Sequence, residues 1–295
     1  MCRTLLQGAR AGAPLHFREE TTLKIAVQLG LLPGDNARDK AKWAADHGVE
    51  GIELGAWGGL DKMRREAEEI GGLVPISSVC GNADATGAGS FDFLDPDPAK
   101  RRASIDGSKG ILGFCGEVGA RGQIVPPIFG GPKVPDLSPV YTPLELEEKL
   151  MLAACQELGP HAASHNTLFM LEPLNRYEQH YLRRQADGVR IIEAAGVPGI
   201  GLLSDLFHMH IEETDSPAAL RAAGQHITNL HLADNTRMEP GTGDIDFVAA
   251  FRALKEIGFT GFMAYECGIT GANAAEKAAA LAKSLDYVRE CREKA

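Results

Sequence analysis

Four residues that can bind a metal ion stand at the ends of four successive apolar runs in the second half of the chain. They are Glu172, Asp205, His231 and Glu266. Three carboxylates and one imidazole form an oxygen-rich donor set, which favours Mn²⁺, Mg²⁺ or Co²⁺ and is also compatible with Zn²⁺. Without a cation, three crowded carboxylates would repel one another and raise one another's pKa. The pattern therefore predicts one bound divalent metal, with Mn²⁺ as the first expectation.

Short apolar runs alternate with longer amphipathic stretches from Leu23 to the end of the chain. Apolar runs of this length between turn residues are typical of buried strands. The expected strands are Leu23–Leu29, Val49–Leu54, Val74–Cys80, Gln123–Ile128, Thr167–Glu172, Ile200–Asp205, Ile227–Leu232 and Gly261–Glu266. The expected helices are Asn36–His47, Leu60–Ile70, Pro143–Leu158, Arg183–Ala195, Phe247–Ile257 and about Ala274–Arg292.

This alternation predicts an α/β fold, a single (β/α)8 TIM barrel. Strands that alternate with helices pair in parallel through right-handed crossovers, and eight such units in roughly 270 residues match a closed barrel. An open doubly wound sheet would more often show a Gly-rich phosphate turn after its first strand. The turn at 29–34 lacks that pattern. In a barrel the four candidate ligands would converge at the carboxyl ends of the strands, where active sites lie.

The barrel is expected to span residues 23–295 as one catalytic domain, since no linker divides the chain. Residues 1–22 are expected to form an N-terminal extension that is poorly ordered. Two segments, 83–100 and 129–142, follow the third and fourth expected strands and are rich in Gly, Pro and Asp. They are longer than a connection requires, so they are expected to be extended loops that form a lid or a subunit contact.

The composition excludes several classes of protein. A net charge of -10 argues against a nucleic-acid partner, which would normally require a basic face. No apolar run approaches the roughly 18 residues needed to cross a membrane, so no membrane partner is expected. The six cysteines are scattered, without a CxxC pair, which is typical of reduced thiols in a cytoplasmic protein.

Longer motifs surround the candidate ligands at 172–178, 205–213, 231–243 and 251–266. They include Glu-Pro-Leu-Asn-Arg-Tyr-Glu, Asp-Leu-Phe-His-Met-His-Ile-Glu-Glu and the Pro-Gly-Thr-Gly run at 240–243. In these motifs the chain resembles the xylose-isomerase-like barrel superfamily, most closely its ketose 3-epimerase branch, which includes the D-tagatose and D-allulose 3-epimerases. The resemblance is strong over residues 167–268 and only barrel-like before them.

The resemblance implies roles for particular residues. The four candidate ligands match the family's metal ligands, and Glu172 and Glu266 also match its acid–base pair. Glu178, His208 and Arg237 match residues that bind the substrate's first hydroxyls and carbonyl. The implied activity is metal-dependent epimerisation or isomerisation of a free sugar, a carbohydrate partner, through an enediolate. The family also implies a homo-oligomer, either a dimer or a tetramer.

Other functions share such a site. The superfamily contains lyases, among them inosose dehydratases and the catalytic subunits that cleave 3-keto C-glycosides, which would require a second subunit. An endonuclease IV-like enzyme would need more histidines and a basic DNA face. A non-catalytic binding protein would leave the acid–base positions unexplained. Isolated residues outside the motifs, Trp57, Cys80, His161 and His165, are expected to pack in the core or lie on a helix surface.

Overall fold

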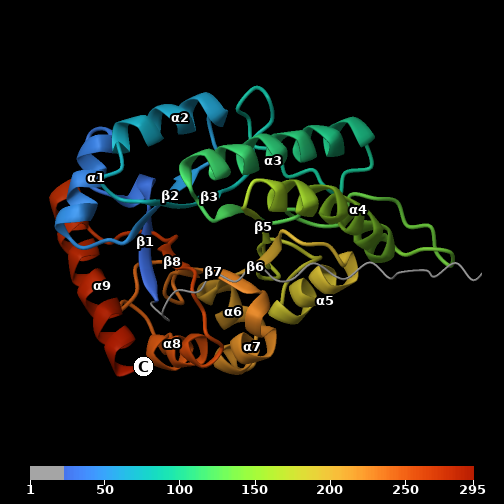
Figure 1. The fold of residues 1–295 in the computed structure, drawn as a ribbon. Coiled ribbons are helices and arrows are strands. Elements are labelled where there is room, and N and C mark those ends of the chain that lie inside the picture. The colour runs from blue at the N-terminus through green and yellow to red at the C-terminus, as the bar shows by residue number, and fades with distance from the viewer. Residues whose placement is uncertain (1–22) are drawn as a thin grey trace, which may run out of the picture.

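The computed structural model describes residues 23–295, which form a closed barrel of eight parallel strands surrounded by helices (Figure 1). The first strand pairs with the second and also with the eighth, which closes the sheet. The expected (β/α)8 TIM barrel is therefore confirmed. Residues 1–22, on which the expected N-terminal extension falls, lie outside the described residues.

All eight expected strands are present, and most are shorter than predicted by one to three residues at an end. The observed strands are β1 (Lys24–Gln28), β2 (Gly51–Gly55), β3 (Ile76–Cys80), β4 (Gly122–Val125), β5 (Leu168–Leu171), β6 (Ile200–Asp205), β7 (Ile227–Leu232) and β8 (Phe262–Tyr265). β6 and β7 have the predicted bounds. These two strands carry two of the four candidate ligands, Asp205 and His231, so the sequence correctly places both ligands at the ends of their strands.

The helices form the outer layer of the barrel. They are α1 (Ala37–Asp46), α2 (Gly59–Ile70), α3 (Pro98–Val118), α4 (Pro143–Ser164), α5 (Gln185–Ala195), α6 (Leu206–Glu212), α7 (Ser216–Ala223), α8 (Phe247–Glu256) and α9 (Ala274–Lys294), with short 3₁₀ turns at Leu29–Leu31 and Gly224–His226. Several begin with a side-chain cap. At α4, for example, Thr142 and Glu145 form a capping box, which satisfies two otherwise unpaired backbone N–H groups.

Helix α3 was not predicted from the sequence, and the expected loop at 83–100 runs into its first residues. Four glycines at three-residue spacing, 107, 110, 113 and 116, interrupt the helical pattern and lower its intrinsic propensity. The fold uses two of them for close packing. A Cβ at Gly107 would lie 2.1 Å from the carbonyl oxygen of Ala83, and one at Gly116 would lie 2.8 Å from that of His165.

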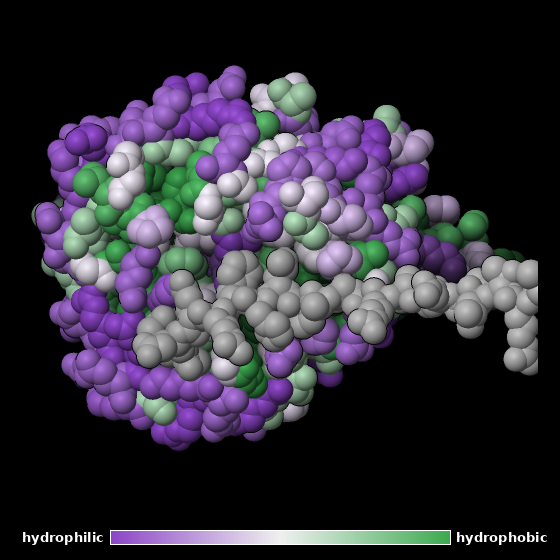
Figure 2. Space-filling view, in the orientation of Figure 1, coloured by the Kyte–Doolittle hydropathy of each residue, from purple (hydrophilic) through white to green (hydrophobic). Residues whose placement is uncertain are grey.

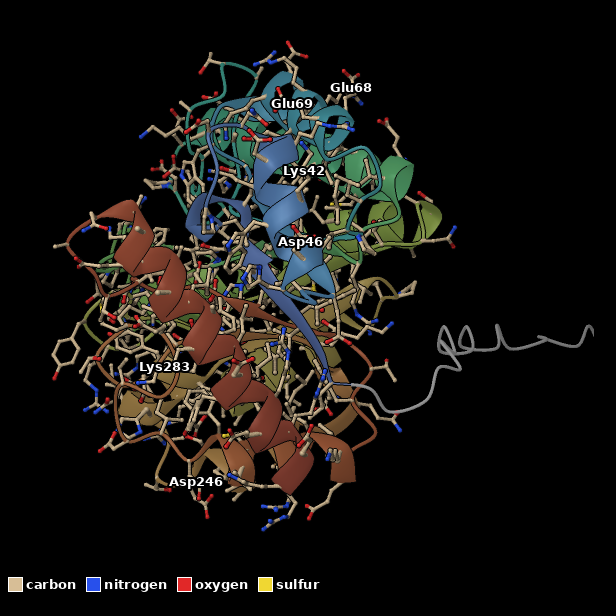
Figure 3. All side chains as sticks on the ribbon, turned by 90° about the vertical axis from the view of Figure 1, so that its left-hand side faces the viewer. Lys42, Asp46, Glu68, Glu69, Asp246 and Lys283 are labelled. Carbon is tan, nitrogen blue, oxygen red and sulfur yellow. The ribbon has the colours of Figure 1, made fainter. Side chains whose placement is uncertain are left out.

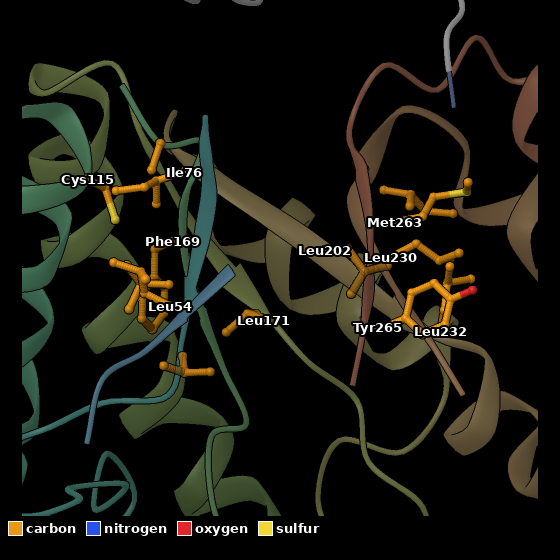
Figure 4. Packing of buried hydrophobic residues seen from close by; sticks show 14 of the residues in the cluster. Leu54, Ile76, Cys115, Phe169, Leu171, Leu202, Leu230, Leu232, Met263 and Tyr265 are labelled. Carbon is orange, nitrogen blue, oxygen red and sulfur yellow. The ribbon is translucent and has the colours of Figure 1, made fainter. Parts of the chain in front are cut away.

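Successive side chains along each strand face opposite sides of the sheet, and this alternation separates two apolar regions. Outward-facing side chains pack against the helices, and Figure 4 shows them in two groups, with Leu54, Ile76, Phe169 and Leu171 in one and Leu202, Leu230, Leu232, Met263 and Tyr265 in the other. A separate small cluster, formed by Ile124, Met170 and Leu203, comes from the intervening positions. Because successive strand residues face opposite sides, this cluster fills the barrel interior below the strand ends.

Hydrophilic residues cover much of the molecular periphery (Figure 2). Exposed charged residues lie on the outer helices, including Lys42 and Asp46 on α1, Glu68 and Glu69 on α2 and Lys283 on α9 (Figure 3). None of the helices within residues 23–295 is both long enough and apolar enough to cross a membrane. The five cysteines in this range are free thiols, as the sequence predicts: Cys80, Cys115, Cys155, Cys267 and Cys291.

Candidate metal centre and active site

The four predicted metal ligands lie together at the carboxyl ends of β5 to β8. Asp205 ends β6 and His231 is the penultimate residue of β7, while Glu172 and Glu266 directly follow β5 and β8. Each side chain faces the barrel axis because the adjacent strand residues pack outward in the apolar layer. One donor atom from each of the four residues lies within 4.8 Å of the others. The geometry that the sequence predicts is therefore present.

His231 is at the centre of this group. Its Nδ1 lies 3.0 Å from Oε1 of Glu172, 2.9 Å from Oε2 of Glu266 and 3.8 Å from Oδ2 of Asp205. The imidazole is fully buried, and so is Asp205. Asp205 also caps α6, because its Oδ1 accepts a hydrogen bond from the backbone N–H of Phe207 at 2.8 Å. Its other oxygen is left facing the centre.

The crowding of charge perturbs these groups strongly. Burial, together with the charge of Glu266, raises the pKa of Glu172 to about 7. Burial alone would lower the pKa of His231, but the carboxylates of Glu266, Glu53 and Glu172 outweigh it and raise that pKa well above its usual range. The pKa of Glu266 is lowered, since His231 and Arg237 overcome the opposing effect of burial. In the metal-free cluster, protons on Glu172 and His231 and the guanidinium of Arg237 therefore offset the negative charge of the carboxylates.

The donor set fits a divalent cation. Buried carboxylates are costly unless they are paired or bound to metal, and three of them converge here beside one imidazole. Glu172, Asp205, His231 and Glu266 would hold the ion, since each offers an oxygen or nitrogen to the same small volume. Burial and the charge of Glu266 raise the pKa of Glu172, so its carboxylate lacks enough nearby positive charge. A hard or borderline divalent ion would supply it.

The side chain of Arg237 contacts two of the four candidate metal ligands directly. Its Nη1 donates to Oδ2 of Asp205 and its Nη2 to Oε2 of Glu266, each at 2.5 Å. The guanidinium stacks over the ring of Phe207, 4.8 Å from the ring centroid. Its backbone is left-handed, with φ of 59°.

The β7–α8 loop, which carries Arg237, is organised by Asp234. The carboxylate of Asp234 accepts hydrogen bonds from the backbone N–H groups of three loop residues, Asn235, Gly241 and Ile245.

His208 is held in a defined orientation beside the ligands. Both the backbone N–H and the side-chain amide of Asn175 donate to its Nδ1, at 3.2 and 2.8 Å. Nδ1 is therefore the unprotonated nitrogen and Nε2 carries the hydrogen. Nε2 lies 3.7 Å from Oδ2 of Asp205. Burial lowers the pKa of His208, so the ring is a neutral hydrogen-bond donor.

Glu178 is also fixed by Asn175, whose amide donates to its Oε1 at 3.0 Å. Its side chain is 42% exposed, the most accessible of the predicted site residues. Together Glu178, His208, Arg237, Glu172 and Glu266 line one cavity of about 110 Å³. The structure thus brings all seven predicted site residues into one place, five lining the cavity and Asp205 and His231 directly beneath it.

An apolar wall faces these polar groups across the cavity, formed by Trp57, Phe91, Pro126, Phe129 and Leu174. Trp57 and Cys80, for which a core or helix-surface role is expected from the sequence, both line the cavity, with Cys80 buried and Trp57 exposed. Cys80 Sγ donates to Oε1 of Glu266 at 3.3 Å. His161 and His165 lie near the end of α4, where His161 contacts the carbonyl of Lys109, in keeping with a helix-surface role. A larger cleft, of about 670 Å³, lies between α2 and α3 and contains none of the seven residues.

Sequence reasoning missed Glu53, a fully buried carboxyl group in the middle of β2. Its Oε1 lies 3.1 Å from Nε2 of His231, on the side of the ring away from the other carboxylates. It also missed Gln28, at the end of β1, whose amide donates to both Glu53 and Glu266, at 3.0 and 3.1 Å. The sequence carries one signal for Glu53, an acid inside the apolar run Gly-Ile-Glu-Leu-Gly. A strand interior rarely buries a charge that has no partner, so such an acid is a candidate site residue.

The barrel and its cluster of carboxylates and histidine define a class of protein. The xylose isomerase-like TIM barrel family matches residues 41–291, and the chain belongs to that family. It is 29% identical over 274 residues, 91% of its own length and 100% of the relative's, to a 3-dehydro-D-guloside 4-epimerase of Escherichia coli K12. It is 33% identical to an L-ribulose 3-epimerase of a Methylomonas species, over 39% of this chain and 40% of that one.

Solved structures agree with this placement. A crystal structure of a 3-keto-D-glucoside 4-epimerase from E. coli superimposes with a TM-score of 0.78 at 27% identity, covering 92% of this chain and 100% of that one. A D-psicose 3-epimerase from Clostridium cellulolyticum superimposes with a TM-score of 0.77 at 18% identity, over 91% of this chain and 99% of the other, which shows a common fold. The chain is therefore a member of an enzyme family, and these relatives are sugar epimerases.

Proposed function

We propose that this protein is a divalent-metal-dependent epimerase that inverts a hydroxyl-bearing carbon next to the ketone of a sugar. One observation carries the proposal. Glu172 and Glu266, from separate strands, both reach His231 Nδ1, at 3.0 and 2.9 Å, and both line the same cavity. Two carboxylates beside one candidate metal centre are what a two-base proton exchange requires. The epimerase relatives support the same conclusion.

The chemical difficulty is that a proton on carbon beside a ketone is a weak acid. When bound, a divalent ion would supply Lewis acidity toward the substrate's carbonyl and hydroxyl oxygens. In the proposal one glutamate takes the proton from one face of the carbon and the other glutamate returns a proton to the opposite face. Positioned acid–base groups of this kind typically contribute about 10²- to 10⁴-fold each. The carbon thereby inverts with no net oxidation.

Three further residues are proposed to hold the substrate. His208 presents its Nε2–H, fixed by Asn175, as a neutral donor to a hydroxyl or carbonyl oxygen. Arg237 presents a cation to the negative charge that develops on oxygen as the proton leaves, a stabilisation that is large in a site from which water is excluded. Glu178, the most exposed of the three, accepts a hydrogen bond from a substrate hydroxyl.

The substrate is proposed to be a sugar ketone, in one of two forms. The relative that aligns over its whole length is named for a 3-keto glycoside, whereas the L-ribulose 3-epimerase match covers 40% of that enzyme. A 3-keto hexoside inverted at C4 and a free ketohexose inverted at C3 present the same reacting unit. We place the glycoside first, because the cavity opens beside the half-exposed rings of Trp57 and Phe129, where a substituent on the sugar would lie.

Product analysis tests the proposal. Protein loaded with Mn²⁺, or with Mg²⁺ for direct spectra, would be incubated with methyl 3-keto-glucoside, D-fructose and an inosose, and the products identified by NMR. Appearance of the C4 epimer of the glycoside, or the C3 epimer of the ketose, is the expected result. Loss of water or release of methanol without epimer would contradict the proposal and place the protein among the lyases.

A further inference from the structure

Glu53 and His231 form a buried pair on the side of the imidazole that faces away from the candidate ligands. Both side chains have no exposed surface. Nε2 of His231 lies 3.1 Å from Oε1 and 3.4 Å from Oε2 of Glu53, while Nδ1 faces Glu172, Asp205 and Glu266. The two nitrogens of one ring thus have different neighbours: one carboxyl group behind, three in front.

Glu53 is itself held as a hydrogen-bond acceptor. The hydroxyl of Ser78 donates to its Oε2 at 2.7 Å, and the amide of Gln28 donates to its Oε1 at 3.0 Å. The Ser78 hydroxyl has one hydrogen, and an ionised carboxylate can only accept, so this hydrogen points to Glu53 while the Ser78 oxygen accepts from the amide of Asn229 at 3.2 Å. Both flanking groups therefore donate to Glu53, and Nε2 of His231 is a third neighbour within hydrogen-bond distance.

We propose that Glu53 is a positioning residue: it accepts the hydrogen of Nε2 and so commits the lone pair of Nδ1 of His231 to the metal centre. This inference rests on the proposed metal binding. A carboxyl group behind a ligating histidine fixes the ring orientation and the tautomer and increases the basicity of the ligating nitrogen. Because Gln28 donates to both Glu53 and Glu266, the same network also fixes one of the carboxylate ligands.

A different arrangement of the same atoms would make Glu53 a direct ligand. Glu53, Cys80 and His231 also offer donor atoms within 4.8 Å of one another. That arrangement would require Nε2 to bind a second ion instead of donating a hydrogen to Glu53. It would also use both imidazole nitrogens as ligands. Ser78 and Gln28 already donate to the two oxygens of Glu53, and Nε2 of His231 lies within hydrogen-bond distance of the same carboxylate, so the structure favours the positioning role.

The test compares Mn²⁺ affinity and the Nε2–H resonance in the wild type and in Glu53→Gln. The variant is nearly isosteric but brings an amide NH₂ against groups that themselves donate. The dissociation constant for Mn²⁺, measured by calorimetry, should rise by about 10- to 100-fold, the usual effect of removing such a partner. In Mg²⁺-loaded protein with ¹⁵N-labelled histidine, the His231 Nε2–H proton should be visible downfield in the wild type and shift upfield in the variant.

Two further variants keep the test interpretable. Glu147→Gln is the matched control, because Glu147 is also fully buried and also contacts a histidine, His180, at 2.5 Å, but is not one of the residues whose donor atoms converge on the centre. It should leave the affinity for Mn²⁺ unchanged. Ser78→Ala, which removes one donor and leaves the carboxyl group, should weaken Mn²⁺ binding in the same direction and serves if Glu53→Gln does not fold.

The outcomes separate this inference from the proposed function. A folded Glu53→Gln protein that binds Mn²⁺ as tightly as the wild type would overturn the positioning role. So would two Mn²⁺ ions per wild-type chain together with an Nε2 that carries no hydrogen. A wild-type protein that binds no divalent ion would overturn the proposed function, and this role with it.

Discussion

The guanidinium of Arg237 donates directly to Glu266, with Nη2 2.5 Å from Oε2. A cation therefore contacts one of the two carboxylates proposed for proton transfer, and it also contacts Asp205. The family resemblance implies only a substrate contact for this arginine. The structure adds a second effect, because Arg237 helps to lower the pKa of Glu266 and so keeps it ionised. In the proposed mechanism, Arg237 therefore both binds the substrate and influences the acid–base chemistry.

Removing Arg237 should therefore affect turnover as well as binding. Arg237→Ala is expected to raise KM and lower kcat, with a fall in kcat/KM of about 30-fold or more, since truncating one partner of a buried charge pair costs ~2–5 kcal/mol. Steady-state kinetics with the sugar ketone would measure it. Arg221→Ala is the control, because Arg221 pairs with Glu256 on the exterior. An unchanged kcat in Arg237→Ala would show that the arginine has no part in the chemical step.

The two glutamates should each be required for turnover. Glu172→Gln and Glu266→Gln keep the size of the side chains but remove a proton acceptor and a charge. Each is expected to lower kcat by at least about 10²-fold while circular dichroism and melting temperature indicate a folded barrel. Epimer formation monitored by NMR is the measurement. If either variant kept a kcat close to that of the wild type, the substituted glutamate would not belong to the proposed acid–base pair.

Metal binding should strengthen as pH rises toward neutrality. The pKa of Glu172 is raised to about 7 in the folded, metal-free protein, so its carboxyl group keeps a proton that the unfolded chain has already lost. The metal-free fold is therefore most stabilised by this group at low pH, and that contribution is lost as pH rises through about 7. Because a metal ion competes with this proton, its binding should release protons.

Calorimetry in two buffers of different ionisation enthalpy measures that release. The dissociation constant for Mn²⁺ should fall from about pH 5.5 to about pH 8, with fewer protons released at the upper end as Glu172 becomes ionised. The raised pKa of His231 acts in the same direction. A constant affinity across this range, with no proton release, would mean that neither group gives up a proton to the ion.

The loop that carries Arg237 depends on a glycine. A Cβ at Gly243 would lie 1.9 Å from Oδ1 of Asn235 and 2.4 Å from Oδ1 of Asp234, the carboxylate that organises the loop. Gly243→Ala should therefore displace Asp234, lower kcat/KM and reduce the melting temperature. Gly30→Ala is the control, since a Cβ there would meet no atom within 4 Å. Wild-type kinetics in Gly243→Ala would show that the loop adjusts without moving Arg237.

Much of the site could be predicted from the sequence because barrel strands end where active sites lie. Glu172, Asp205, His231 and Glu266 each follow an apolar run, so the strand pattern alone places them at one end of the barrel. The predicted bounds of β6 and β7 are correct: a Pro-Gly pair directly precedes β6, and β7 contains neither glycine nor proline. Glu178, His208 and Arg237 could be selected only through the family resemblance, since surface acids and bases at those spacings are common.

The parts that were missed have physical causes. Glu53 lies within a strand, and only the closed barrel brings β2 opposite His231 on β7. Trp57 and Cys80 belong to the first half of the chain, where the resemblance offers no motif, and their position at the cavity depends on tertiary packing. Helix α3 carries glycines that lower its helix propensity in isolation but allow its backbone to approach Ala83 and His165 closely.

Deuterium exchange tests the central claim most directly. Protein stripped with a chelator would be incubated in D₂O with methyl 3-keto-glucoside or D-fructose, before and after Mn²⁺ is restored, and the sugar recovered for NMR. The proposed mechanism predicts deuterium at the carbon beside the ketone, C4 of the glycoside or C3 of the ketose, together with the epimer, and only when metal is present. Epimer that forms equally fast in the stripped protein, or metal-loaded protein that exchanges no proton in either sugar, would contradict it.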